Sequence, residues 1–119
     1  MKSQIPNSTL VAGVIAFNAQ QWAEAFMLFQ THWLEVRSDE CKALAQYANA
    51  LNQLTLGLTT APRTMLTRVL VLTAEGTQRT GIDIPRMRKD VAHILAHIPA
   101  EDAGANTVQI PPVQLEWRS

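Results

Sequence analysis

The chain has 119 residues, of which 47% are hydrophobic and 17% charged, and its formal net charge at pH 7 is zero. This length suits one domain with a single core, and the low charged fraction indicates that much of the chain is buried in a core or an interface. Cys41 is the single cysteine, which excludes an internal disulfide, and the opening residues lack the features of a signal peptide. We therefore expect a cytoplasmic protein with a buried, inert thiol.

Two helices are predicted in the first third of the chain. Asn7 or Ser8 can cap the first helix, which should end near Asn18–Ala19 because asparagine tolerates the left-handed conformation at a helix C-terminus. A second helix is predicted over residues 21–36, and the short connection makes the two helices antiparallel neighbours. Its apolar side chains recur every three or four residues and should share one inward face: Trp22, Ala25, Phe26, Phe29 and Trp33.

A third helix is predicted to begin at Ser38 or Asp39 and to end near residues 57–58. No charged residue occurs over residues 43–62. A helix without charges is normally enclosed on more than one side, so we expect this one to be the central helix of the fold. Polar residues interrupt its apolar run too often for a membrane span.

A line of amide side chains on this third helix is a candidate interface. Gln46, Asn49 and Gln53 lie at helical spacing, and two interpretations remain open: a solvated edge, or a helix–helix contact that uses amide hydrogen bonds. Trp117 near the C-terminus is a second candidate interface residue, because a monomer need not bury it. We expect either self-association or a protein partner.

Two further helices and a tail complete the prediction. A proline-led start near residues 59–62 predicts a fourth helix that ends before Gly81, and Asp83 can cap a fifth helix that Pro99 ends. The fold class is therefore all-α, with a single-domain bundle of about five helices over residues 1–98 and an extended tail over residues 99–119. Apolar residues of the tail could pack on the bundle or on a partner: Val108, Ile110, Val113, Leu115 and Trp117.

Metal and cofactor motifs are mostly missing from the sequence. There is no phosphate-binding glycine loop, paired-cysteine zinc motif or nucleophile elbow, and we expect no cofactor. His93 and His97 are four residues apart and could share a metal with His32 as a third ligand. The alternative is a pair of surface histidines near a helix C-terminus, where positive charge is favourable.

Positive charge is concentrated in the basic segment, which we define as residues 63–89. It has six basic and two acidic residues, a net charge of +4, and mildly acidic regions flank it on both sides. Such a segment can attract a phosphate-bearing partner such as nucleic acid. The alternative is an ordinary helix surface whose charges are balanced across the fold, and nucleic-acid-binding proteins usually show a stronger bias.

The order of several short motifs resembles the small all-helical bacterial family catalogued as domain of unknown function 309. That family's pattern is FN, an aromatic residue, EAHE, LE and W, followed by GLIQ in the next helix and a later G-I-D segment. The resemblance covers roughly residues 13–95. The matching residues are Phe17, Asn18, Trp22, Glu24, Ala25, Trp33, Leu44, Gln46, Ala48, Ala50, Leu51, Gly57, Gly81, Ile82 and Asp83.

The chain departs from this pattern where the family has its acid–base residues. Phe26 and Met27 replace the family's His and Glu, and Gln30 replaces a further Glu. A phenyl ring and a thioether neither bind hard cations nor transfer protons. We therefore expect a degenerate site filled by packing, with Phe26 at the centre of the inward face and Glu24 and Gln46 as the remaining polar positions.

These observations favour a non-catalytic interaction or structural protein that self-associates or binds another protein. One alternative is a small-molecule- or metal-binding protein, conceivably an enzyme, with a pocket between the second and third helices. Glu24, Gln30 and Gln46 would line that pocket. A weaker alternative is contact with phosphate or nucleic acid through the basic segment.

Overall fold

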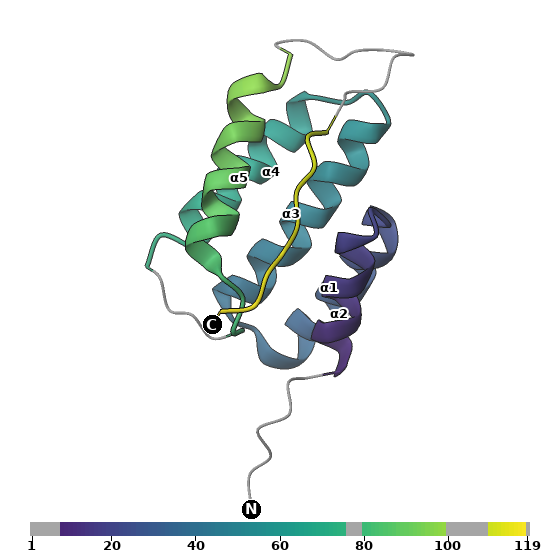
Figure 1. Ribbon diagram of the computed structural model, residues 1–119, viewed down its shortest axis with the longest axis vertical. Helices are drawn as coiled ribbons and strands as arrows, with labels where there is room; N and C mark the ends of the chain where they lie inside the picture. The colour runs from purple at the N-terminus through teal and green to yellow at the C-terminus, as the bar shows by residue number, and fades with distance from the viewer. Residues whose placement is uncertain (1–7, 76–79, 100–109, 119) are drawn as a thin grey trace, which may run out of the picture.

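The computed structural model describes residues 8–75, 80–99 and 110–118. Within them, each helix packs against the next one in the chain, with α1 and α2 at one side of the array and α4 and α5 at the other (Figure 1). An isolated bridge between Ile82 and Trp117 is the only β-type pairing in this part of the chain. The prediction of a single all-α domain with about five helices is confirmed. The helices are α1 (Ser8–Asn18), α2 (Trp22–Val36), α3 (Asp39–Thr55), α4 (Thr60–Leu72) and α5 (Ile84–His97).

Two of the predicted helix starts are fixed by side-chain caps. The Ser38 hydroxyl oxygen accepts a hydrogen bond from the backbone N–H of Cys41 at 3.2 Å, at the start of α3. A carboxylate oxygen of Asp83 accepts one from the backbone N–H of Arg86 at 3.1 Å, at the start of α5. Each cap satisfies one of the donors that a first helical turn leaves unpaired.

The pairing of α1 with α2 is antiparallel and close. Phe17 packs on Trp22 with ring centroids 4.9 Å apart, and one turn or more away Gly13 faces Phe29. A Cβ atom at Gly13 would lie 2.6 Å from the Phe29 ring, so the absence of a side chain is what permits this approach. The chain reverses through Gln20, which has a φ of 64°.

The sequence-based reason given for the end of α1 is wrong. The helix does end at Asn18, but the left-handed residue is Gln20, two residues further on. The amide side chain of Asn18 has a different use, described below. Asn7, the other predicted cap residue, lies outside the described residues.

The inward face of α2 also differs from the prediction. Trp22, Ala25 and Phe29 are buried, but the next inward residue is His32, and Trp33 is only half-buried. Phe26 is likewise half-buried, at the margin of the core, so it is not the centre of the inward face. The buried face of α2 consists of residues 22, 25, 29 and 32 and is rotated relative to the predicted face. The sequence did not reveal it because a histidine interrupts its apolar pattern.

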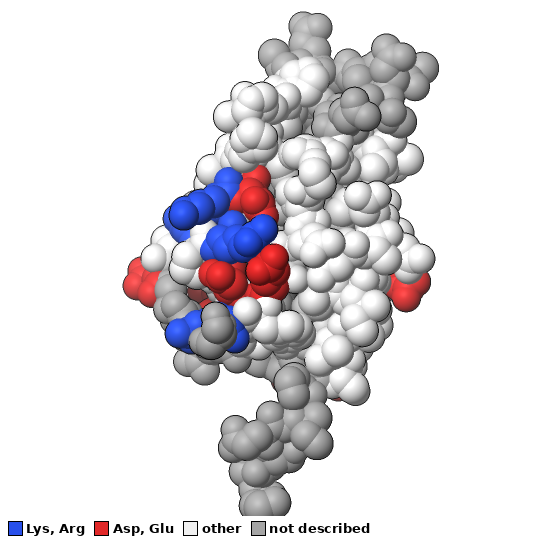
Figure 2. Space-filling view, in the orientation of Figure 1, with Lys and Arg blue, Asp and Glu red and all other residues white. Residues whose placement is uncertain are grey.

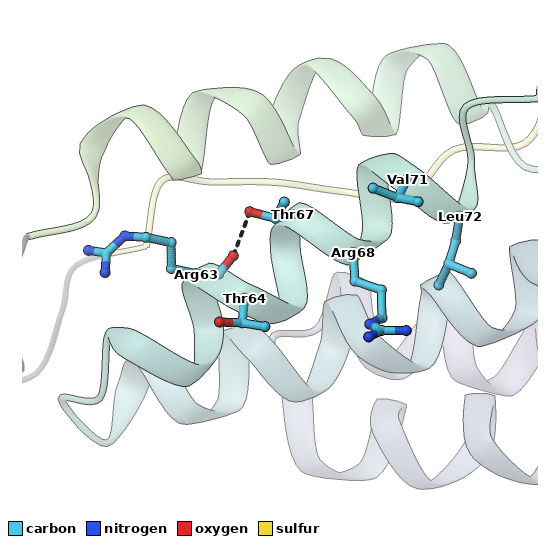
Figure 3. A pocket seen from close by; sticks show the side chains of 6 residues that line it. All are labelled: Arg63, Thr64, Thr67, Arg68, Val71 and Leu72. Atoms are coloured by element: carbon cyan, nitrogen blue, oxygen red, sulfur yellow. Dashed lines mark hydrogen bonds between the residues drawn. The ribbon is translucent and has the colours of Figure 1, made fainter.

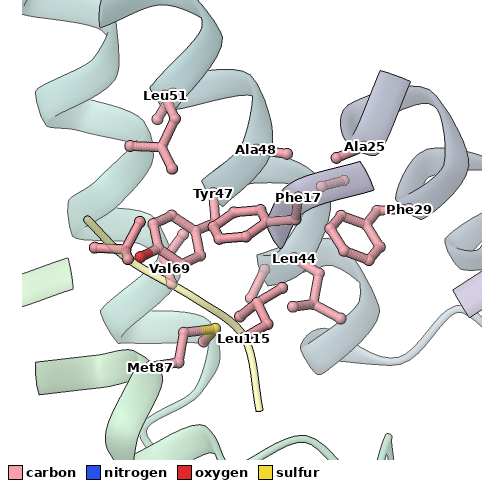
Figure 4. Close-up of a cluster of buried hydrophobic side chains, with 14 of the residues drawn as sticks. Phe17, Ala25, Phe29, Leu44, Tyr47, Ala48, Leu51, Val69, Met87 and Leu115 are labelled. Atoms are coloured by element: carbon pink, nitrogen blue, oxygen red, sulfur yellow. The ribbon is translucent and has the colours of Figure 1, made fainter. Parts of the chain in front are cut away.

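Helix α3, which has no charged residue after Lys42, is the centre of the fold, as predicted. Ten of its residues are buried, and they cover most of its circumference. The Tyr47 ring reaches from α3 to Phe17 of α1, with centroids 4.9 Å apart, and Figure 4 shows it within the cluster that joins α1, α2, α4 and the tail. One strip of α3 is left half-buried, consisting of Lys42, Gln46, Asn49 and Gln53.

The described part of the tail, residues 110–118, is an extended segment that lies on the bundle (Figure 1). Its side chains Val113 and Leu115 belong to the core. The backbone N–H of Asp83 donates to the carbonyl oxygen of Glu116 at 2.7 Å, and the N–H of Arg118 donates to the carbonyl oxygen of Gly81 at 2.7 Å. Of the apolar tail residues predicted to pack, Val108 lies outside the described residues.

Asn18 holds the same tail from its other side. Its side-chain nitrogen donates to the carbonyl oxygen of Leu115 at 3.0 Å, and its side-chain oxygen accepts from the N–H of Leu115 at 2.8 Å. One amide side chain thus satisfies both backbone groups of a buried residue that is 97 positions away in the chain. The tail is therefore fixed by hydrogen bonds from α1 and from the segment before α5.

Replacing Asn18 should destabilise the protein strongly. In Asn18→Ala both backbone groups of Leu115 lose their partner, and we expect the free energy of unfolding to fall by about 2–6 kcal/mol, at about 1–3 kcal/mol for each group left unsatisfied. Urea denaturation followed by circular dichroism measures the change. The control is Asn49→Ala on the half-buried strip of α3, which should change stability by less than about 1 kcal/mol. Equal losses in both variants would contradict the role assigned to Asn18.

Candidate functional site

The residues of the predicted degenerate pocket that lie on α2 point in different directions. Residues two positions apart on a helix point about 200° apart, so exposed Glu24 faces away from Phe26. Met27 is 67% exposed and does not fill the interior, which contradicts the expectation that packing replaces the family's Glu at this position. Gln30 is exposed and Gln46 is half-buried. None of these five residues is among the described lining of the two hollows described below.

The predicted interface residues are also split between two places. Gln46, Asn49 and Gln53 remain together on the half-buried strip of α3. Trp117 pairs with Ile82, and the adjacent Thr80 binds Glu40 at the start of α3. Along the axis of α3, Glu40 lies about 9 Å from Gln46 and about 20 Å from Gln53. Trp117 therefore lies near the start of α3, beyond one end of the amide line.

Trp117 has a structural contact within the chain. Its ring lies over Gly81, where a Cβ atom would come within 3.7 Å of it, and Gly81 has a φ of +86°. The ring remains 40% exposed. The tryptophan that looked isolated in the sequence is therefore partly used to anchor the tail.

The three candidate metal-binding histidines do not meet. His32 is only 5% exposed and faces the core from α2, whereas His93 and His97 are exposed on α5 with ring centroids 4.4 Å apart. His97 Nδ1 lies 2.8 Å from the carbonyl oxygen of His93, within the same helix. In the parts of the chain that the structure describes, no group of three His, Cys, Asp or Glu side chains is placed to hold a metal ion.

Glu40 is a buried carboxylate that the sequence analysis did not single out. One of its oxygens accepts the backbone N–H of Thr80 at 2.9 Å and the hydroxyl of Thr80 at 2.8 Å. The sequence shows only that Glu40 lies in the first turn of a predicted helix. The helix dipole alone accounts for an acidic residue at that position. The contact fixes the segment before α5 against the start of α3.

Three buried titratable side chains have pKa values shifted by burial. Cys41 is buried, as predicted, and this burial raises the pKa of its thiol. Burial also raises the pKa of Tyr47, with a smaller contribution from Asp90. Burial lowers the pKa of His32, which Glu35 opposes in part. Among the residues that the structure describes, the Tyr47 hydroxyl and His32 Nδ1 find no hydrogen-bond partner.

Much of the positive charge of the basic segment is engaged within the molecule. The Arg63 guanidinium donates to the carbonyl oxygen of Pro99, just after α5. The Arg86 guanidinium lies 3.5 Å from a carboxylate oxygen of Glu116, and the Arg88 guanidinium donates to the carbonyl oxygen of Leu70 near the end of α4. Arg79 lies outside the described residues. Figure 2 shows acidic side chains interspersed with the basic ones on this face, whereas the surface over α1 is neutral. The arrangement favours a balanced helix surface over a phosphate-binding face.

The outer face of α4 borders a hollow of about 460 Å³ (Figure 3). The hydroxyl of Thr67 donates to the carbonyl oxygen of Arg63 at 2.8 Å, and that of Thr64 donates to the helix backbone at 3.3 Å. A hydroxyl that already donates has only lone pairs left to offer. The remaining donors in the hollow belong to Arg68 and to Arg63, whose Nη2 already donates to the carbonyl oxygen of Pro99.

The outer face of α2 carries an uncharged line that the sequence analysis overlooked. Ala23, Met27, Gln30 and Leu34 are all exposed, and their spacing of four, three and four residues is the spacing of a coiled-coil contact. We call these four residues the outer seam of α2. Met27 is 67% exposed and Leu34 is 52% exposed. The signal was present in the sequence but was masked by the larger aromatic residues on the inward face.

Aromatic side chains flank this outer seam. Phe26 and Trp33, each one residue before a seam position, are half-buried. The guanidinium carbon of Arg37 lies 4.6 Å from the centroid of the Trp33 ring, and the Lys42 ammonium lies 5.7 Å from it. These cation–π contacts fix the Trp33 ring at the edge of the seam.

Comparison with family models, with curated proteins and with solved structures finds no match to this chain. The resemblance to the family catalogued as domain of unknown function 309 therefore stays a prediction. None of the helices in the described part of the chain is long and apolar enough to cross a membrane. Function has to be inferred from the surfaces and contacts described above.

The buried His32 predicts a specific dependence of stability on pH. An unfolded histidine protonates near pH 6.5, whereas the lowered pKa keeps folded His32 neutral to lower pH. The unfolded state thus binds more protons, and the protein should lose stability as the pH falls from about 7 to 5. His32→Leu removes this loss and also the unsatisfied Nδ1, so the variant should gain stability relative to the natural chain, and gain more at pH 5 than at pH 8.

Urea denaturation at pH 8, 6 and 5 checks the histidine prediction. The matched control is His93→Leu, which replaces an exposed histidine on α5 and should preserve the pH dependence of the natural chain. A gain in His32→Leu that is the same at every pH would show that protonation of His32 is not linked to folding.

Proposed function

We propose that this protein is a non-catalytic helical interaction protein that self-associates through the outer seam of α2. The observation that supports this best is the exposure of Met27 and Leu34 on an uncharged helix face with coiled-coil spacing. Burying such side chains against a second helix gains about 25 cal/mol for each square ångström of apolar surface removed from water. In the family pattern that the sequence resembles, a Glu occupies the position of Met27. This chain therefore has an apolar side chain where that pattern has a charged one.

A second copy of the chain is the occupant that fits this seam. In an antiparallel pair of α2 helices, Ala23 lies opposite Leu34 of the second copy, and Met27 lies opposite Gln30. A small residue then faces a large one at both ends of the contact, as close packing of two helices requires. The two Gln30 side chains occupy adjacent layers near the two-fold axis, where their amides can hydrogen-bond to each other.

The flanks of the seam are compatible with the same pairing. Phe26 lies beside Trp33 of the second copy, which gives an aromatic contact on one flank. On the other flank Glu24 lies beside Thr31 of the second copy, so no like charges are opposed. A parallel pair would instead align each residue with its own copy and place Leu34 against Leu34 and Ala23 against Ala23, which leaves a gap at one end.

The seam is short, so the association should be weak. Eleven residue steps separate Ala23 from Leu34, which corresponds to about 17 Å of helix. Interfaces of this extent belong to the small class found in transient complexes. The proposal also places the protein in the cytoplasm, where the lone buried thiol of Cys41 would stay reduced.

Sedimentation velocity from about 1 to 500 µM tests the self-association, because weak dimers dissociate with constants on the order of 10–100 µM. The natural chain should shift from monomer toward dimer over this range. Met27→Glu places a charge in the contact and should raise the dissociation constant by at least about tenfold, or 1.4 kcal/mol. Leu34→Glu should act in the same direction.

A matched control separates the seam from general surface apolarity. Leu56, after α3, is 64% exposed and lies outside the seam, so Leu56→Glu should leave the association unchanged. A natural chain that stays monomeric at the highest concentration would refute the proposal. An equal effect of Met27→Glu and Leu56→Glu would refute the assignment to α2.

A further inference from the structure

A groove between α4 and α5 has the form of a binding site for a small organic anion. Its hollow measures about 510 Å³, and its walls combine the end of α4 with the first turns of α5. Apolar side chains contribute most of the lining, among them Leu70, Ile84, Pro85 and Ala92. Arg88 and Lys89 are the charged residues among the described lining, and no acidic residue accompanies them.

Within the described part of the chain, Arg88 is held in place by contacts that use only one of its three nitrogens. Its Nη1 donates to the carbonyl oxygen of Leu70 at 2.6 Å and to the hydroxyl oxygen of Thr73 at 2.7 Å. The Thr73 hydroxyl is fixed in turn, because it donates to the carbonyl oxygen of Val69 at 2.8 Å. The guanidinium is therefore positioned by the backbone of α4 before any ligand arrives.

The remaining donors of Arg88 form the fork that suits a carboxylate. A guanidinium has five N–H donors, and with both on Nη1 engaged, those on Nε and Nη2 remain. These two nitrogens present parallel N–H groups, which is the geometry of a bidentate bond to a carboxylate. The ion pair found in the described part of the chain joins Arg86 to Glu116, so no protein carboxylate there neutralises Arg88.

We propose that this groove binds a small apolar carboxylate, with its carboxylate on the Nε–Nη2 fork of Arg88 and its hydrocarbon body on the apolar walls. Lys89 is exposed at the groove and adds a second positive charge. A half-buried guanidinium without an acidic partner is costly to desolvate, and an anionic ligand offsets that cost. A larger dianionic phosphate would gain less, since most of the groove surface is apolar.

Binding of naphthoate, compared with neutral naphthalenemethanol, tests this inference on the full chain. Fluorescence titration should show that naphthoate binds at least about tenfold more tightly than the alcohol, because only the anion can use the charged fork. Arg88→Met should remove this preference. Arg68→Met, on the outer face of α4, is the matched control and should preserve it.

A second variant keeps the test valid if Arg88→Met fails to fold. Ala92 is exposed and lines the groove, so Ala92→Trp should fill the space without touching the hydrogen bonds of Arg88. Naphthoate affinity should fall by at least about tenfold in this variant, while its urea denaturation curve stays close to that of the natural chain. Equal affinity for the acid and the alcohol, or unchanged naphthoate affinity in Ala92→Trp, would overturn the inference. Met27→Glu should leave naphthoate binding intact, which separates this site from the proposed self-association.

Discussion

The fold depends on covering the central helix α3 from a third side. Helices α2 and α4 pack on two sides of it, and the tail segment with Val113 and Leu115 completes the enclosure. An extended segment brings backbone donors and acceptors into the core, and each one left unsatisfied there costs about 1–3 kcal/mol. Asn18 on one edge and the segment 81–83 on the other supply those hydrogen bonds. The polar contacts therefore make the apolar enclosure of α3 possible.

Local sequence signals predicted the helices well because helix boundaries are set by neighbouring residues. The caps at Ser38 and Asp83 satisfy donors within three positions, and the sequence contains all the information needed to place them. The absence of charge after Lys42 correctly identified α3 as the central helix for a similar reason, since a largely enclosed helix tolerates few charges. The predictions were thus strongest where the determining contacts lie within one helix.

The same reasoning failed where a contact joins distant parts of the chain. Asn18 was interpreted as a helix-ending residue, but its partner is 97 positions away and no local pattern reveals it. Trp33 was placed inward because it is large and apolar, yet His32 takes that position and Trp33 is stabilised at the edge by Arg37 and Lys42. The candidate pocket residues could not be located for a related reason. Which of Glu24 and Phe26 faces the bundle depends on the rotation of α2 about its axis, which tertiary packing decides.

The positive charge of the basic segment shows how an overall bias can mislead about function. Arg63 and Arg86 each connect α4 or α5 to a segment outside the pair, through a carbonyl oxygen or a carboxylate. Their charge stabilises the arrangement of the C-terminal half and is not available as a continuous surface for nucleic acid. Arg88 donates through Nη1 to two acceptors at the end of α4, and it lines the mainly apolar groove between α4 and α5, which contains no acidic residue among its described lining. The ability of a basic surface to bind a ligand then depends on which N–H donors are left without a protein acceptor, more than on the number of Arg and Lys residues.

The two proposed surfaces lie on opposite sides of α3, which bears on how they would operate together. The outer seam of α2 faces away from the core, and the Arg88 groove lies between α4 and α5, beyond the central helix. A ligand in the groove therefore cannot block a second copy on α2 by direct contact. Any influence of ligand binding on self-association has to pass through α3, whose buried residues are closely packed. Two polar atoms without a hydrogen-bond partner among the described residues lie in this region, the Tyr47 hydroxyl on α3 and His32 Nδ1 on α2. Because a closely packed helix moves as a unit and resists gradual deformation, the default expectation is independent binding at the two surfaces.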